Sequence, residues 1–290
     1  MKLILKFNLV FIIVFLLGLA AAGYVSHDLL QKNAREEILQ NARLVMETSL
    51  ATRAYTSGQI QPLLETQMKY AFLPQSVPSY SAQEVLGGLR KKFPEYAYKE
   101  ATLNPTNPRD RAVDWEADIV NQFRGNPERG EIIGERDTPT GRNLYIARPI
   151  QIKDPKCLVC HSTVEAAPKT MVDRYGPANG FGWQLNEIIG AQVVAVPTAV
   201  PIDRANAVFR TFMISLTAVF VIIGIALNLM LAQMVIRPVT KLSKLADEVS
   251  LGNMDVPDFR VRGRDEIGTL AQSFNRMKKS LVQAMKMLEE

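Results

Sequence analysis

The chain has 290 residues, of which 47% are hydrophobic and 22% charged, and its 34 basic and 29 acidic side chains leave a net charge of +5. This composition excludes an intrinsically disordered chain, which would be poorer in apolar residues and further from charge balance. Two cysteines are too few for a disulfide scaffold, and the charge excess is too small to indicate nucleic-acid binding. The length fits one or two domains.

The apolar residues are concentrated in two uncharged stretches, at 7–26 and 211–235. At about 1.5 Å per residue, a helix of 20 residues or more crosses a hydrocarbon core of about 30 Å. We therefore predict two transmembrane helices. A cleaved signal peptide is the alternative for the first stretch, because the small residues at 20–23 resemble a cleavage site.

The distribution of charge predicts the topology. Residues 25–207 hold 21 basic and 21 acidic side chains, so the remaining 13 basic and 8 acidic ones lie in the tails and flanks. Since positive charge is enriched on the cytoplasmic side, we expect residues 1–6 and 236–290 in the cytoplasm. Residues 27–208 then form an extracytoplasmic domain, held at a bacterial inner membrane by two spans.

The segment after the first stretch has a helical pattern. Residues 24–56 contain no proline or glycine, and small or apolar residues recur every three or four positions, which predicts one long helix leaving the membrane. We expect Gly58 and Pro62 to interrupt it. Ser81 is expected to cap a second helix that reaches Lys92.

The rest of the middle region predicts an α+β domain in which an antiparallel sheet is flanked by helices. The strands are expected at 96–103, 131–136, 143–152 and 187–197, with a helix at 112–123 and another that resumes after Pro201 and continues into the second stretch.

Both cysteines and one of the two histidines lie in the sequence CLVCH at 157–161. Two thiols three residues apart can add to the two vinyl groups of a haem, and the adjoining histidine can then bind the iron. We predict one covalent haem c, attached through Cys157 and Cys160, with His161 as the proximal iron ligand. The predicted topology places this motif outside the cytoplasm, where covalent haem attachment takes place.

Two other readings of the motif stay open. A structural zinc ion needs four ligands, and the only further Cys or His is His27, next to the first stretch. A redox dithiol normally follows a strand in a βαβ unit and needs no adjoining histidine.

The surroundings of the haem are less determined by sequence. Aromatic and basic residues near the motif could form walls or bind propionates, although core packing is the alternative for each: Phe181, Trp183, Tyr175, Tyr145 and Arg148. The sixth ligand is open between Met46, Met68, Met171, His27, Tyr80 and water or a vacancy. Met46 is our named candidate, although a methionine at helical spacing usually fills a core. A vacant site would favour gas binding, and a methionine or histidine ligand would favour redox sensing.

Several longer segments carry a family resemblance: TRAYTS at 52–57, VPSY at 77–80, YAYKEATLNPTNPRD at 96–110, ARPIQIKDPKCLVCH at 147–161 and YGPANGFGWQLNEIIGAQVVAVP at 175–197. Through them, residues 35–200 resemble single-haem c-type sensor domains with a PAS-like fold that are attached to bacterial signalling proteins. The resemblance implies haem binding through Cys157, Cys160 and His161. It does not fix the distal ligand, and this chain has no spare cysteine for the thiolate that related domains can use.

The C-terminal region predicts a helical bundle. After Pro238, apolar residues at coiled-coil spacing occur in two segments separated by a Gly252 connector: Leu242, Leu245 and Val249, then Ile267, Leu270, Phe274, Met277, Leu281, Ala284 and Leu288. Two short helices cannot bury these seams alone, so we expect a homodimer with a parallel four-helix bundle. RPVTKLSKLADEVSLGNMD at 237–255 and RDEIGTLAQSFNRMKKSL at 264–281 resemble a HAMP domain.

These observations lead to one main hypothesis, a dimeric membrane sensor whose haem detects redox state or a small gas and signals through HAMP. Because the sequence ends at Glu290, we expect no catalytic domain. The output is then a separate cytoplasmic protein, of the kinase or chemotaxis type, unless the chain is part of a longer receptor. The alternatives are a membrane-anchored cytochrome for electron transfer and a small-molecule receptor with a structural haem.

Overall fold

The computed structural model describes residues 3–139, 141–260, 263 and 265–289. These divide into two compact units. The mixed domain is His27–Val208, and the helical unit combines Met1–Ser26 with Phe209–Glu290. Two residues of the predicted bundle, Arg264 and the side chain of Leu288, lie outside the described part.

The long helix predicted at 24–56 is confirmed as part of α1, Leu3–Tyr55. Its buried side chains recur every three or four residues: Ala34, Ile38, Ala42, Met46 and Ser49. The expected interruption is wrong in form, because the chain stays helical through a π-helical turn, η1 (Thr56–Ile60), into α2 (Gln61–Met68). Pro62 lies in the first turn of α2, directly after the π-helical turn, and it has no N–H to bond a carbonyl of the preceding turn.

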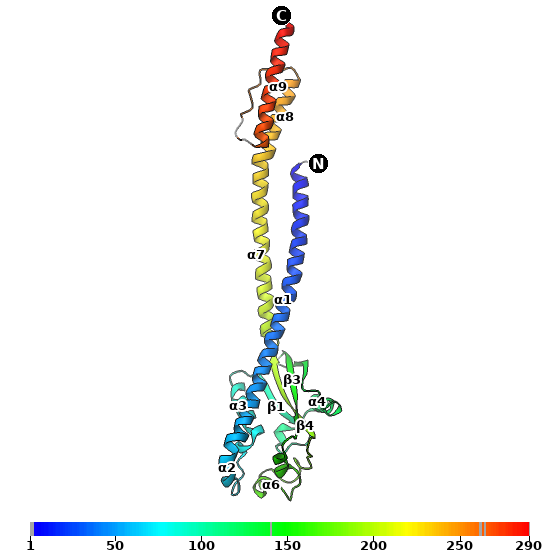
Figure 1. The fold of residues 1–290 in the computed structure, drawn as a ribbon, viewed down its shortest axis with the longest axis vertical. Coiled ribbons are helices and arrows are strands. Elements are labelled where there is room, and N and C mark those ends of the chain that lie inside the picture. Colours follow the sequence, from blue (N-terminus) through cyan, green and yellow to red (C-terminus); the bar gives the residue numbers. More distant parts are fainter. Residues whose placement is uncertain (1–2, 140, 261–262, 264, 290) are drawn as a thin grey trace. The chain divides into compact units, whose positions relative to one another are not determined.

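The predicted antiparallel sheet with flanking helices is also confirmed (Figure 1). Its strands are β1 (Ala97–Thr102), β2 (Ile132–Thr138), β3 (Gly141–Gln151) and β4 (Ile188–Pro197), in the order β1-β4-β3-β2. Every pairing is antiparallel. Strand β4 pairs on both edges and is buried along most of its length, which explains its nearly continuous apolar sequence.

The sheet separates two hydrophobic cores, one on each face. On one face, α4 (Asp114–Gly125) contributes Phe123, which packs with Val193 of β4. On the other face, Met46 of α1 packs with Val194 of the same strand. Consecutive residues of a strand point to opposite faces, so β4 supplies both cores.

Shorter helices complete the mixed domain: η2 (Pro74–Ser76), α3 (Pro78–Arg90), η3 (Pro108–Asp110), η4 (Pro155–Cys157), α5 (Leu158–His161) and α6 (Lys169–Tyr175). The prediction that Ser81 caps the second helix is wrong. Helix α3 begins three residues earlier, with Pro78 in its first turn and Val77 as N-cap. Proline favours the first helical position because its φ is already helical, and the Ser81 hydroxyl instead donates to the Gln75 carbonyl at 2.9 Å.

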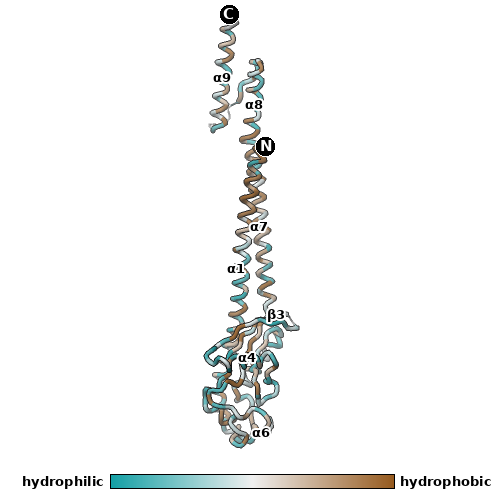
Figure 2. Tube along the Cα trace, turned by 90° about the vertical axis from the view of Figure 1, so that its right-hand side faces the viewer, coloured by the Kyte–Doolittle hydropathy of each residue, from teal (hydrophilic) through white to brown (hydrophobic). Residues whose placement is uncertain are grey.

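The helical unit contains two candidate membrane-spanning helices, defined by length and apolar composition. One is the N-terminal part of α1, and the other lies in α7 (Ala199–Leu231); Figure 2 colours both apolar stretches brown. Within this unit, the side-chain amides of Asn8 and Asn228 bind each other reciprocally at 2.9 and 2.7 Å. A π-helical turn, η5 (Ala232–Ile236), follows α7.

The predicted bundle helices are present as α8 (Arg237–Ser250) and α9 (Glu266–Glu289). Five apolar residues from α8, the connector and α9 form one cluster: Leu242, Leu245, Val249, Val256 and Phe274. Asp265 caps α9 by accepting from the Gly268 N–H at 2.8 Å. A Cβ at Gly268 would lie 2.1 Å from the Gly263 carbonyl oxygen, so a glycine here allows the connector backbone to pass close to α9. Leu270, Met277 and Leu281 remain exposed in the single chain.

Candidate functional site

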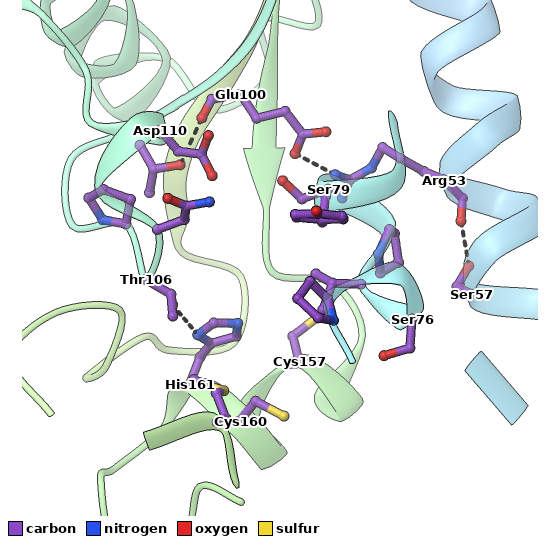
Figure 3. Close-up of a pocket in the computed structure, with 18 of the residues that line it drawn as sticks. Arg53, Ser57, Ser76, Ser79, Glu100, Thr106, Asp110, Cys157, Cys160 and His161 are labelled. Carbon is purple, nitrogen blue, oxygen red and sulfur yellow. Dashed lines mark hydrogen bonds and ion pairs between the residues drawn. The ribbon is translucent and has the colours of Figure 1, made fainter. Parts of the chain in front are cut away.

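The mixed domain contains a partly open cavity of about 450 Å³, within the range of cofactor and ligand sites (Figure 3). Its walls come from the end of α1, η1 and α2, from β1 and η3, and from the chain around η4 and α5. The three predicted site residues, Cys157, Cys160 and His161, all line it. The structure therefore brings the whole CLVCH motif to a single cavity.

The motif is held by a local turn. The Asp154 carboxylate accepts from the Lys156 N–H at 2.9 Å and caps η4, and α5 follows at once. Cys157 lies three positions before Cys160 and four before His161, so it shares a face of the turn with each of them, and all three residues line the cavity. Both cysteines are free thiols, and burial raises the pKa of each.

The imidazole of His161 is oriented by its neighbours. Its Nδ1 lies 2.7 Å from the Gly180 carbonyl oxygen, which can only accept, so Nδ1 carries the proton and donates. Its ring stacks on Trp183, with centroids 3.9 Å apart. Burial lowers the pKa of His161, although the bond to Gly180 opposes the shift. The neutral ring thus keeps the Nε2 lone pair for a metal.

Gly180 itself is constrained twice. Its φ is +85°, and a Cβ there would lie 2.0 Å from Thr106 Oγ1 and 2.8 Å from Thr106 Cα. The Gly180 N–H donates to the Asn104 side-chain oxygen at 3.1 Å, which anchors the residue whose carbonyl binds His161. A glycine is therefore needed here for both conformation and space.

We expect Gly180→Ala to lower the free energy of unfolding by about 2–5 kcal/mol, combining left-handed strain with overpacking. The matched control is Gly182→Ala. Gly182 has a φ of +80° but nothing within 4 Å of its would-be Cβ, so only about 1–2 kcal/mol of strain is expected. Urea unfolding of the purified chain in detergent compares the two. Equal losses would show that contact with Thr106 is unimportant.

An ion pair between a partly exposed arginine and a buried glutamate forms a polar wall of the cavity. Arg53 of α1 donates to Glu100 of β1, whose side chain is 3% exposed (Figure 3). The Tyr98 hydroxyl donates to the other oxygen of Glu100 at 2.6 Å. Burial alone would lower the pKa of Arg53, but the charge of Glu100, its hydrogen bond and smaller contributions from Tyr98 and Cys157 together raise the pKa. The pair links α1, whose N-terminal part is the first candidate membrane span, to strand β1 of the sheet.

The remaining sequence candidates divide into two groups. Met68, Met171, Tyr80, Tyr175 and Trp183 line the cavity, whereas Phe181, Tyr145, Arg148, Met46 and His27 are not among its lining residues. Tyr145 packs on Trp115 in the α4 core, and Arg148 pairs with Glu47 and Glu131.

The distal-ligand candidate Met46 needs correction. Its side chain is 0% exposed and fills the core between α1 and the sheet. His27 precedes Arg53 by 26 positions on α1, about 39 Å along the helix at about 1.5 Å per residue. Met68 lines the cavity, but its sulfur accepts from the Leu73 N–H at 3.1 Å and the Ser76 hydroxyl at 3.3 Å.

The donor set fits a covalent haem. Two thiols and an imidazole with an available Nε2 lie together on one helical turn at a cavity, and an aromatic ring, Trp183, stacks on the imidazole. Arg109 and Lys156 add basic groups at its lining. Among the described residues, no group of three or more Cys, His, Asp or Glu side chains could hold a metal ion, so the zinc alternative gains no support.

Sequence comparison identifies the domain. The family described as Tll0287-like matches residues 31–197, which is more than half of the chain. The chain belongs to the Tll0287-like family. A HAMP domain matches residues 230–283 and confirms the predicted HAMP resemblance. The solved structure titled as that of the cyanobacterial heme-protein Tll0287 has a TM-score of 0.44 and 16% identity, covering 56% of this chain and 95% of its own.

Two curated relatives share shorter segments. A protein of Acetivibrio thermocellus named as a sensory transducer is 39% identical over 67 residues, which is 23% of this chain and 12% of the relative. The heme sensor protein HssS of Staphylococcus aureus is 35% identical over 94 residues, 32% of this chain and 20% of the relative. The Tll0287-like chain thus spans a fifth or less of the length of these relatives.

Sequence reasoning missed several residues of the site: Arg53, Glu100, Thr106, Asp110 and Gly180. Four of them lie inside the segments TRAYTS and YAYKEATLNPTNPRD, and the fifth lies in the glycine-rich YGPANGFGWQ. These segments carried the family resemblance, so the signal was present. Their common location became visible only in the fold.

Proposed function

We propose that this chain is a membrane-bound haem sensor with a single haem c, attached through Cys157 and Cys160 and bound at the iron by His161. The observation that carries the proposal is the placement of CLVCH at the cavity, with His161 Nδ1 bonded to Gly180 and Nε2 left for the metal. When bound, haem supplies an iron that changes oxidation state or takes a small ligand. The names of the relatives agree with a sensory role.

The chain's own residues perform the remaining tasks. Gly180 and Trp183 hold the His161 ring at a fixed orientation, as outer groups do for metal ligands generally. Arg53 and Glu100 link the cavity to α1 and to the sheet.

Signal transfer in this proposal passes along continuous helices. Helix α1 runs unbroken from Leu3 to Tyr55, and α7 leads through η5 into α8 of the HAMP domain. A change of charge or ligation at the cavity would displace Arg53 and the helix that carries it. Such a shift can bias a bundle that has two packing states.

The topology and partners are part of the same proposal. Residues 27–208 lie outside the cytoplasm, because the positive excess is in the tails, and both termini lie inside. The chain forms a homodimer through HAMP, where Leu270, Met277 and Leu281 are exposed in the single chain. It acts without enzymatic activity of its own, on a separate cytoplasmic partner of the kinase or chemotaxis type.

The test is to express the full chain in bacteria with a cytochrome c maturation system and to purify it in detergent. We expect haem to remain on the denatured chain in a stained gel, at one haem per chain by its pyridine spectrum. Absence of covalent haem would contradict the proposal. A reduced spectrum that shifts with CO would indicate ligand sensing, and an unchanged one would favour redox sensing or the electron-transfer alternative.

A further inference from the structure

Asp110 is an unusual carboxyl group at the cavity. It ends η3 and lines the cavity, and its position is labelled in Figure 3. Its Oδ1 is buried and has no hydrogen-bond partner, the one such side-chain atom in the part of the chain that the structure describes. A buried polar atom without a partner costs free energy, so a functional role can explain why this one is retained.

The neighbouring charges do not neutralise Asp110 fully. Arg109 Nε lies 3.6 Å from Oδ1, but Arg109 Nη1 binds Glu84 of α3 at 2.6 Å. From β1, Lys99 binds Glu116 at 2.6 Å. Both nearby cations are therefore engaged by other carboxylates.

Burial raises the pKa of Asp110 to about 6. Hydrogen bonding to Gln83 and the charges of Arg109 and Lys99 oppose this increase, and Glu100 adds to it. Asp110 thus exchanges its proton close to neutral pH, where an ordinary aspartate is fully ionised.

We propose that Asp110 is a proton-binding site coupled to the oxidation state of the cofactor that His161 holds. This inference rests on the proposed function and adds a second ligand, the proton, to the site. In the coupled step, one electron from a one-electron reductant converts ferric to ferrous iron. One proton from water converts the Asp110 carboxylate to the carboxylic acid, and the charge of the cavity is unchanged.

The physical reason is electrostatic. An added electron in the cavity repels the Asp110 carboxylate that lines it, and this repulsion is stronger for a partly buried carboxylate than for one in bulk solvent. Protonation of Asp110 removes that repulsion, so reduction raises the affinity of Asp110 for its proton. By linkage, the proton also favours the reduced state, and the reduction potential falls as pH rises between the pKa of Asp110 in the oxidised state and its higher pKa in the reduced state.

The test is a potentiometric titration of the full haem-loaded chain in detergent, with dithionite as reductant, at several pH values from 5 to 9 on the order of one unit apart. For the wild type we expect the reduction potential to change with pH by an amount approaching about 59 mV per tenfold change in proton concentration, the value for one proton and one electron. Asp110→Asn keeps the size of the side chain and should lose most of this dependence on pH. Asp137→Asn, which changes an aspartate of β2 that does not line the cavity, should retain it.

An infrared difference spectrum between the oxidised and reduced chain provides a second readout. Reduction should produce a carboxylic-acid band that shifts when the aspartates of the chain are labelled with ¹³C. The propionates of haem carry no label, so a band from them would not shift. If Asp110→Asn fails to fold or to bind haem, the labelled band must be present both in the wild type and in Asp154→Asn, which removes the other aspartate that lines the cavity. The coupling would be overturned by a band that does not shift with the label, or by an equal dependence of reduction potential on pH in the wild type and Asp110→Asn. Either result would leave the proposed function standing. Absence of covalent haem in a stained gel would instead remove the proposed function and this coupling with it.

Discussion

Replacing both Cys157 and Cys160 by serine is expected to abolish covalent haem attachment completely. These are the two cysteines of the sequence, so no other thiol can form a thioether. Both lie half-buried on one turn, and exchange of sulfur for oxygen changes little of the packing around them. Mass spectrometry of the denatured chain should show no added haem mass, and a denaturing gel stained for haem should show no band. The far-ultraviolet circular dichroism should be unchanged.

Two matched variants make this experiment specific. Met46→Leu changes a sulfur-bearing residue of the α1 core that does not line the cavity, so covalent haem and its reduced spectrum should both be retained. Met171→Leu changes a buried methionine that does line the cavity. A spectral change in Met171→Leu alone would identify it as the distal ligand, and covalent haem in the double serine variant would contradict the assignment of the thiols.

Local patterns in the sequence predicted most of this fold, because helices and strands are determined largely by residues that are close together in the sequence. Alternating and apolar runs located the four strands to within two residues, and the absence of proline and glycine located the long helix. The CLVCH motif was equally accessible, since its three groups lie within a single helical turn. Helix starts were less accurate, because Pro78 competes with Ser81 for the first turn of α3.

The error over Met46 has a geometric cause. Met46 and Arg53 are seven residues apart and therefore share a face of α1, as the periodicity indicates. They differ by about 10 Å along the helix axis, at about 1.5 Å per residue. Met46 lies over the sheet, whereas Arg53 reaches past it to the cavity. Sequence spacing defines a face but does not reveal where along the helix the sheet ends.

The support of His161 by Gly180 was hidden for another reason. The two residues are 19 positions apart, and the contact uses a backbone carbonyl, which leaves no side-chain pattern. Gly180 could be noticed only as one of several glycines in YGPANGFGWQ. Its role depends on a φ of +85° and on the approach of Thr106, which are both properties of the folded chain.

Arg53→Met is expected to lower the free energy of unfolding by about 3–5 kcal/mol, the usual cost of leaving one partner of a buried pair uncompensated. Glu100 would remain almost fully buried, with the Tyr98 hydroxyl at 2.6 Å as its remaining side-chain partner among those the structure gives for its carboxylate. Methionine keeps most of the volume and the helical propensity of arginine, so the loss reports on charge. Urea unfolding of the purified full chain in detergent measures it.

The double variant Arg53→Met with Glu100→Gln separates the ion pair from packing. The glutamine introduced by Glu100→Gln would still accept from the Tyr98 hydroxyl but would carry no charge, so we expect the double variant to recover most of the stability lost by Arg53→Met alone. Equal instability in the single and double variants would show that the arginine acts through packing of its aliphatic part. Recovery would instead establish that α1 is held to β1 at the cavity by charge, and a link held by charge is one that a change of charge within the cavity can alter.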